Sequence, residues 1–140
     1  MVFSGEITVE TQGNTDIRDI TPEVRRLVDG SGIATGLCTV FARGSTGAIT
    51  SIEFEPGAVA DLAEAIGRIA PADIPYRHDE AWHDGNGHSH VRAALVGPSL
   101  TVPVQAGKML LGTWQQIVFL DFDNRPRRRS LIVQIVGEPA

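Results

Sequence analysis

Strand-forming segments separated by turn residues constrain the fold of this chain more than any other feature. Residues 3–11 alternate apolar and polar side chains with a period of two, which is typical of a half-buried strand. Residues 109–122 are strand-rich, with an interruption near Gly112. Shorter runs rich in β-branched and apolar residues predict further strands at 16–20, 33–42, 48–54, 100–104 and 131–136.

Helices are predicted at fewer places. Thr21-Pro22-Glu23 opens a helix that ends at Gly30-Ser31-Gly32, because proline suits the first helical position and glycine the end. A second helix starts at Glu55-Pro56, with apolar residues at spacings of three and four, and residues 90–96 form a short third one. Strands and helices do not alternate regularly, so we predict an α+β fold in a single domain, residues 1–140.

Charge and composition exclude several classes of protein. The net charge of −5 argues against nucleic-acid binding, which needs a basic face. No run of 18 apolar residues predicts a membrane span, and the first residues do not resemble a signal peptide. Cys38 is the one cysteine, which fits a reducing compartment. We therefore expect a cytoplasmic protein that binds neither membranes nor nucleic acids.

All four histidines lie between residues 78 and 90, mixed with acidic and amide side chains. Imidazole and carboxylate are common ligands of divalent metals, so His78, His88 and His90 are candidate metal ligands. The pattern is no standard zinc signature, so zinc, magnesium and manganese all stay possible. His88 and His90 share a face only if the chain is extended there. The alternative is a solvated, glycine-rich surface loop.

Other polar groups are candidate contacts for a phosphorylated small molecule. Ser45 and Thr46, in the turn 44–47, could cradle a phosphate or simply connect two strands. Arg125 and Arg127 could bind an anion or protect the end of a hairpin. Glu53 is a candidate general base, or it is simply an exposed glutamate on a strand.

Three blocks in the same order resemble the YjbQ-like family of small proteins, to which secondary thiamine-phosphate synthase activity is attributed. The most specific block is DGNGHSHVRAALVGPSL, residues 84–100. The others are LGTWQ at 111–115 and STGAIT at 45–50, with Glu53 downstream. Many relatives carry a histidine where this chain has Gly44, so any role of that histidine is absent here or taken by another group.

The resemblance implies a sandwich of mainly antiparallel strands with two to three helices, assembled as a homotrimer with sites at subunit interfaces. It implies a metal-assisted transferase that joins hydroxymethylpyrimidine diphosphate to thiazole phosphate and releases pyrophosphate. The alternative is a non-catalytic trimer that binds a metal or a phosphorylated metabolite. From the resemblance and the chemistry together, we expect Glu53, His78 and Arg92 to be catalytic and His78, His88 and His90 to bind the metal. We expect the substrate's phosphate groups to be bound by Ser45, Thr46, Asp84, Asn86, Arg125 and Arg127.

Overall fold

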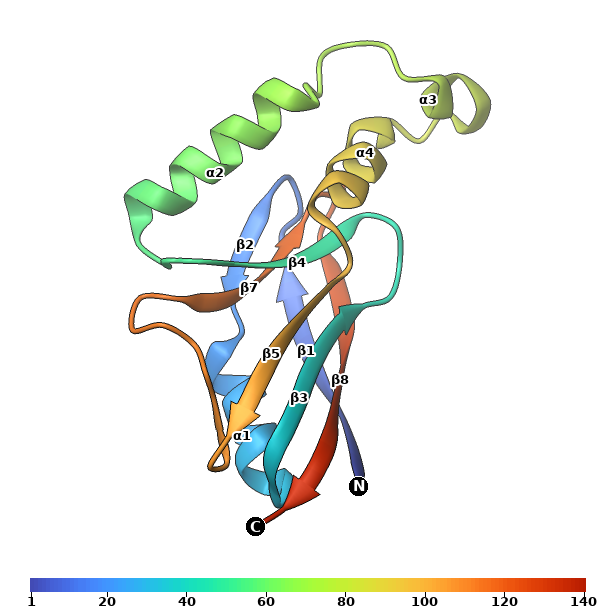
Figure 1. Cartoon of the computed structure of the whole chain (residues 1–140). Helices are drawn as coiled ribbons and strands as arrows, with labels where there is room; N and C mark the ends of the chain where they lie inside the picture. The colour runs from blue at the N-terminus through green and yellow to red at the C-terminus, as the bar shows by residue number, and fades with distance from the viewer.

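The computed structural model describes all residues from 1 to 140 and arranges them in three layers (Figure 1). A five-stranded sheet, in the order β1-β8-β3-β5-β6, packs against a three-stranded sheet, β2-β7-β4, and every neighbouring pair is antiparallel. The strands are β1 (Val2–Thr11), β2 (Asp16–Asp19), β3 (Ile33–Ala42), β4 (Gly47–Ile52), β5 (Ser99–Gln105), β6 (Lys108–Met109), β7 (Gln116–Asp121) and β8 (Arg127–Pro139).

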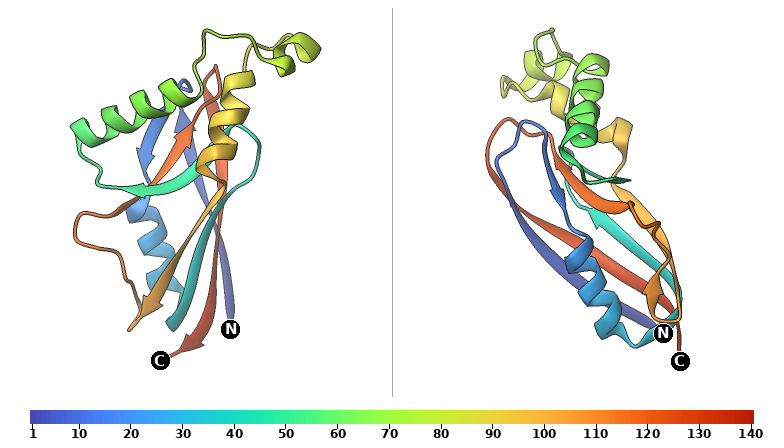
Figure 2. Two further views of the ribbon diagram at one scale, coloured as in Figure 1. Left: turned by 45° about the horizontal axis from the view of Figure 1, so that its top comes forward. Right: turned by 90° about the vertical axis from the view of Figure 1, so that its left-hand side faces the viewer.

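Four helices complete the fold, and none is long and apolar enough to cross a bilayer. In Figure 2, α2 and α4 cover the outer side of the smaller sheet, while α1 lies beside it near the chain ends. The bounds are α1 (Thr21–Ser31), α2 (Pro56–Ile69), α3 (Arg77–Trp82) and α4 (Gly87–Val96).

Strand β7 separates two apolar cores because its side chains alternate between its two faces. Ile117 and Phe119 point into the main core between the sheets, where β3, β5, β8 and α1 contribute buried residues. Val118 and Leu120 point the other way, into a smaller core under α2 and α4. Asp121 continues the first face and therefore carries its carboxylate between the two sheets, where it is fully buried.

The predicted α+β architecture is confirmed, and the strands lie within a few residues of their expected bounds. The second helix starts as expected, with the Glu55 carboxylate accepting bonds from the amides of Gly57 and Ala58. Helix α3 was not predicted, because six residues are too few to show a helical period. Helix α4 begins at Gly87, three residues before the expected start, and this difference changes the geometry of the histidines.

Candidate functional site

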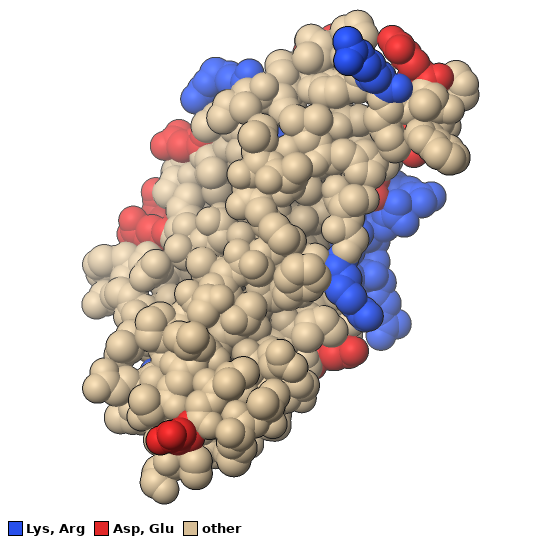
Figure 3. Space-filling model, turned by 45° about the vertical axis from the view of Figure 1, so that its right-hand side comes forward, with Lys and Arg blue, Asp and Glu red and all other residues tan.

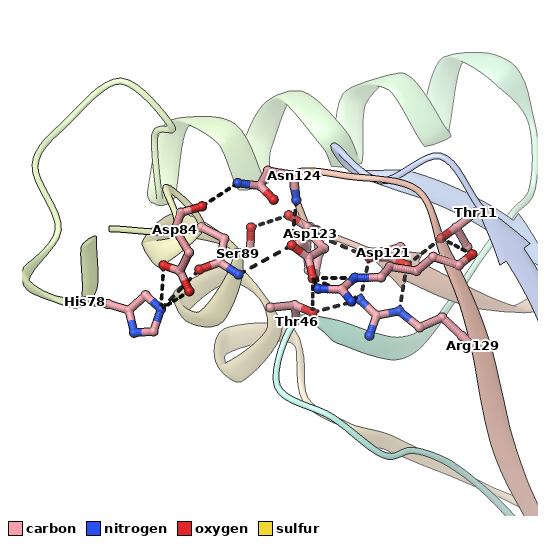
Figure 4. A network of polar contacts seen from close by, with 12 residues as sticks. Thr11, Thr46, His78, Asp84, Ser89, Asp121, Asp123, Asn124 and Arg129 are labelled. Carbon is pink, nitrogen blue, oxygen red and sulfur yellow. Dashed lines mark hydrogen bonds and ion pairs between the residues drawn. The ribbon is translucent and has the colours of Figure 1, made fainter. Parts of the chain in front are cut away.

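Helices α3 and α4 bring two of the four histidines together at one end of the molecule. The ring centroids of His78 and His90 lie 4.3 Å apart, with their planes at 57°. His78 Nε2 lies 3.1 Å from Asp84 Oδ1, in the loop between the helices (Figure 4). A carboxylate in contact with one ring nitrogen is a common way of orienting a ligating imidazole.

His88 does not join this pair. The prediction that His88 and His90 share one ion required an extended segment, but both residues belong to α4, where they point about 200° apart. The His88 side chain is 8 % exposed and its ring centroid lies 6.3 Å from that of Tyr76. Burial and the charge of Arg92 lower the pKa of His88, so neutral imidazole is favoured. Within one chain His88 and His90 are therefore directed apart, and the role of His88 as a metal ligand stays a prediction.

The start of α4 is held by a carboxylate from α3. Asp79 Oδ1 accepts a 2.9 Å hydrogen bond from the amide of Gly87. A Cβ atom on Gly87 would lie 2.5 Å from Tyr76 Cβ, so only glycine permits this close approach. Asn86 occupies the capping position of α4 without making a capping bond. Asp79 thus sets the orientation of α4 and of His90 upon it.

Asn86 instead lies between the histidine pair and the buried acidic groups of the sheets. Its amide nitrogen, when turned toward Asp84, donates to Oδ1 at 2.9 Å and Oδ2 at 3.2 Å. Turned the other way, it makes a single 3.4 Å bond to Asp123. In the first orientation the same nitrogen also lies 3.1 Å from His78 Nε2, so Asn86 contacts both members of the His78–Asp84 pair.

Two buried carboxylates beside this loop were missed in the sequence. Asp121 accepts bonds at 2.8 Å from both Nε and Nη2 of Arg129, and also from the Thr11 hydroxyl and the Asp123 amide (Figure 4). Burial on its own raises the pKa of Asp121, but the bonds from Arg129, Thr11 and the backbone outweigh it and lower the pKa overall. Asp121 is therefore an ionised partner of Arg129.

Asp123 is the second buried carboxylate. It accepts bonds from Nε and Nη2 of Arg127 at 3.0 and 2.7 Å, and from the Thr46 hydroxyl at 3.1 Å. Burial on its own raises the pKa of Asp123, but the bonds from the Asn124 amide and Arg127 outweigh it, so the pKa is lowered overall. Thr46 and Arg127, two predicted phosphate contacts, are thus already bonded to Asp123.

Ser45 and Arg125 remain exposed and are the predicted phosphate contacts with open surface around them. The side chain of Asn124 donates a 2.8 Å bond to the backbone oxygen of Asp84. This bond joins the arginine-rich turn, which contains Arg125, to the histidine loop. The phosphate role of Ser45 and Arg125 stays a prediction.

Arg92 makes helix contacts from the buried side of α4. Its Nε donates to the backbone oxygen of Ala70, the last residue of the α2 turn, at 2.9 Å. Its Nη1 donates to the Thr15 hydroxyl at 3.0 Å. A cation at a helix C-terminus is favoured by the helix dipole, which explains why this guanidinium is buried without a carboxylate partner. The catalytic role of Arg92 stays a prediction.

Glu53 lies at the far end of β4 from the histidine loop. Thr46 precedes β4 and contacts the acidic network, whereas Glu53 follows the last residue of the strand. Six residues at about 3.3 Å each place roughly 20 Å between the two ends. Within one chain, Glu53 is therefore not beside His78, His88 or His90, and the single pocket that would join them is not formed.

Gly44, in the turn before β4, has a φ of 111°. An L-residue is strained in that conformation, so the turn is adapted to glycine. A Cβ atom there would lie 3.7 Å from Nη1 of Arg129, which indicates that Arg129 faces the space a larger side chain would occupy.

The single chain holds no group of three or more histidine, cysteine or acidic side chains arranged as metal ligands. His78 and His90 are the paired imidazoles, with Asp84 behind His78. Such a pair supplies two nitrogen ligands and one orienting carboxylate, so further ligands would come from substrate, water or a neighbouring copy.

Comparisons with known proteins agree with this description. The sequence model of the family described as "UPF0047 protein YjbQ-like" matches residues 5–138. The chain is 39 % identical over 138 residues to a UPF0047 protein of Methanothermobacter thermautotrophicus, covering 99 % of this chain and 94 % of the relative. It is 40 % identical over 129 residues to a UPF0047 protein of Archaeoglobus fulgidus, covering 92 % and 98 %.

Solved structures of similar proteins share the fold. A crystal structure from Sulfolobus solfataricus, described as a YbjQ-like protein of unknown function, matches with a TM-score of 0.93, 33 % identity and 99 % coverage of both chains. An uncharacterised family member from Clostridium acetobutylicum matches with a TM-score of 0.86 and 36 % identity, over 94 % of this chain and 98 % of the other. The chain therefore belongs to the YjbQ-like UPF0047 family.

Proposed function

We propose that the paired imidazoles of His78 and His90 hold a divalent metal ion, and that the protein is a transferase acting on a diphosphorylated small molecule. The observation that carries this proposal is that His78 Nε2 contacts Asp84 while the rings of His78 and His90 lie 4.3 Å apart. Burial of Asn86 next to Asp84 helps keep that carboxylate ordered. A bound ion would neutralise the charge of a departing diphosphate.

The specific reaction we propose is secondary thiamine-phosphate synthesis. The methylene carbon of hydroxymethylpyrimidine diphosphate bonds to the nitrogen of thiazole phosphate, while its bond to the diphosphate oxygen breaks. The attacking nitrogen carries no proton, so this step requires no base to remove one. The task of the protein is then to bind the diphosphate and stabilise its charge as it leaves. Arg125, joined to the histidine loop through Asn124, is the cation placed for that contact.

The alternative is a protein that binds a metal or a phosphorylated metabolite without turnover. The internal bonds of Thr46 and Arg127 support this alternative, because they reduce the number of free groups that could stabilise a transition state.

We further propose that the protein assembles as a homotrimer and uses the open face of the larger sheet as its contact surface. The centre of this face carries exposed Leu37, Phe41 and Val136, next to Thr39 and Gln134. Figure 3 shows a broad area with few charges over the middle of the molecule, with basic groups gathered along one edge. Arg43 borders the hollow in this face, and chains that each carry a net charge of −5 repel one another less across a face with few charges.

The test combines metal content with product formation. Untagged wild type is compared with His78→Ala, His90→Ala and the control His83→Asn, because His83 is exposed and asparagine tolerates its positive φ. Metal is measured by mass spectrometry and thiamine phosphate by chromatography after incubation with both substrates and the ion. We expect about one ion per chain and product in wild type and control, and loss of both in the two alanine variants.

Other results separate the two functions. Metal binding without product at any enzyme concentration supports the binding protein over the transferase. Equal metal content and equal product in wild type and His78→Ala refute the proposed site. The assembly is tested by light scattering after chromatography, where Phe41→Glu should convert the trimer to a monomer because it places a charge in the centre of the contact face.

A further inference from the structure

A cleft at the opposite end of β4 from the histidine pair carries a second site. The cleft has a volume of about 440 Å³ and lies where the segment after β4 meets the turn that precedes β7. Two aromatic side chains line it: Trp114 is 71 % exposed and Phe54 is 43 % exposed. An indole with this much exposure loses favourable burial, so a position of this kind suggests contact with a ligand.

The backbone around both aromatic residues is held in place by side-chain bonds. Gln115 accepts a bond from the Gly112 amide at 3.1 Å and donates another to the Ser51 hydroxyl at 3.1 Å. The Phe54 amide donates to Gln116 Oε1 at 2.8 Å. These bonds fix the turn that carries Trp114 against β4, so the indole is presented to solvent from an ordered segment.

The charges around the cleft are all acidic, and no lysine or arginine lines it. Two of its three carboxylates already have partners: Asp19 accepts a bond from the Thr21 amide at the start of α1, and Glu55 caps α2. Each of these charges is matched by the positive end of a helix dipole. The Glu53 carboxylate has no hydrogen-bond or ion-pair partner within the chain, and Glu53 follows β4 in the same cleft as the exposed aromatic rings.

We infer that this cleft binds an organic cation, a quaternary ammonium or a substituted protonated amine, between the rings of Trp114 and Phe54 with Glu53 as counter-ion. The face of an indole attracts a cation through its quadrupole, and a carboxylate without a partner adds to that attraction. Apolar substituents on the cation bury aromatic surface that is otherwise wet. Within one chain this site is separate from the proposed transferase site, because it lies at the opposite end of β4, a strand roughly 20 Å long, from the Thr46 end beside the acidic network.

The test uses choline as the cation and 3,3-dimethylbutan-1-ol as its neutral isostere. The chain has two tryptophans, so a nitrogen–proton correlation spectrum of labelled protein shows two indole signals. The signal that disappears in Trp114→Leu identifies its residue. We expect choline to shift that signal in a saturable manner, with the signal of Trp82 unchanged and the neutral isostere binding at least several-fold more weakly.

Matched variants assign the interaction. Trp114→Leu and Glu53→Gln should each weaken choline binding by roughly three- to thirty-fold, measured by calorimetry. Trp82→Leu is the control, because Trp82 is 73 % exposed yet lies at the other end of the molecule, as the last residue of α3. Thermal unfolding of each variant confirms that it is folded. Equal binding of the neutral isostere, no saturable shift of Trp114, or unchanged affinity in both cleft variants would each overturn the inference.

Discussion

Replacing Asp121 with alanine tests the idea that a buried ion pair holds the two sheets together beside the candidate site. Asp121 is fully buried and forms two 2.8 Å bonds with Arg129, whose side chain is 15 % exposed. The substitution removes the carboxylate and leaves the guanidinium between the sheets. It also removes the acceptor of the Thr11 hydroxyl and of the Asp123 amide.

The magnitude follows from the geometry of the pair. Removing one partner of a buried ion pair typically costs about 3–5 kcal/mol, because the other charge stays desolvated. Asp123 Oδ2 lies 3.7 Å from Arg129 Nη2 and compensates part of the lost charge. We therefore expect Asp121→Ala to lower the free energy of unfolding by about 3 kcal/mol, near the lower end of that range.

Urea unfolding, followed by far-UV circular dichroism, measures this change. Arg26→Ala is the control, because Arg26 and Glu23 form an exposed pair at 4.0 Å that should contribute less than about 0.5 kcal/mol. The double variant Asp121→Leu with Arg129→Met should recover much of the loss, since apolar residues can replace a buried pair. A loss below about 1 kcal/mol for Asp121→Ala, or additive losses in the double variant, would refute the reasoning.

Three further predictions concern stability and reactivity. The folded protein lowers the pKa values of Asp121 and Asp123 below the ordinary 3.8, so their contribution to the free energy of unfolding is fully present above that pH and is lost as the pH falls through the lowered values. Urea midpoints should therefore decline below about pH 4, and they should decline less steeply in Asp121→Asn. Gly30→Ala should stabilise the protein by about 0.5–1 kcal/mol, because Gly30 lies in α1 with open space around it. Gly87→Ala should destabilise the protein by about 1–3 kcal/mol, because the added methyl group clashes with Tyr76. Thermal unfolding measures both changes. Burial raises the pKa of Cys38 to about 11, so a thiol reagent at neutral pH should label unfolded but not native protein.

Local pattern predicted most of the secondary structure because strands and amphipathic helices leave a period in the sequence. The alternation in β1 and the apolar stripe of α2 are examples, and both elements lie within one or two residues of their expected bounds. The start of α4 was not predictable in the same way. It depends on Asp79, eight residues earlier in α3, whose carboxylate accepts a hydrogen bond from the Gly87 amide.

The candidate site was likewise predictable only in part from local pattern. The cluster of histidines could be read from composition, but which of them meet could not, since a helix or an extended segment orients His88 and His90 differently. Asp121 and Asp123 offered one signal that went unused. An acidic residue within a run of buried strand residues is costly unless it is paired, and Arg129, also on an inward-facing strand position, was the partner.

By itself, the sequence determined the α+β class, the family and the position of the histidine-rich loop, because these depend on short-range periodicity and on motifs contiguous in the chain. Only the tertiary structure decided that His78 pairs with His90, that Thr46 and Arg127 are bonded to Asp123, and that Glu53 lies beside Trp114. Each of these contacts joins residues from different elements. Their distances follow from how the sheets and helices pack, and no local pattern records that packing.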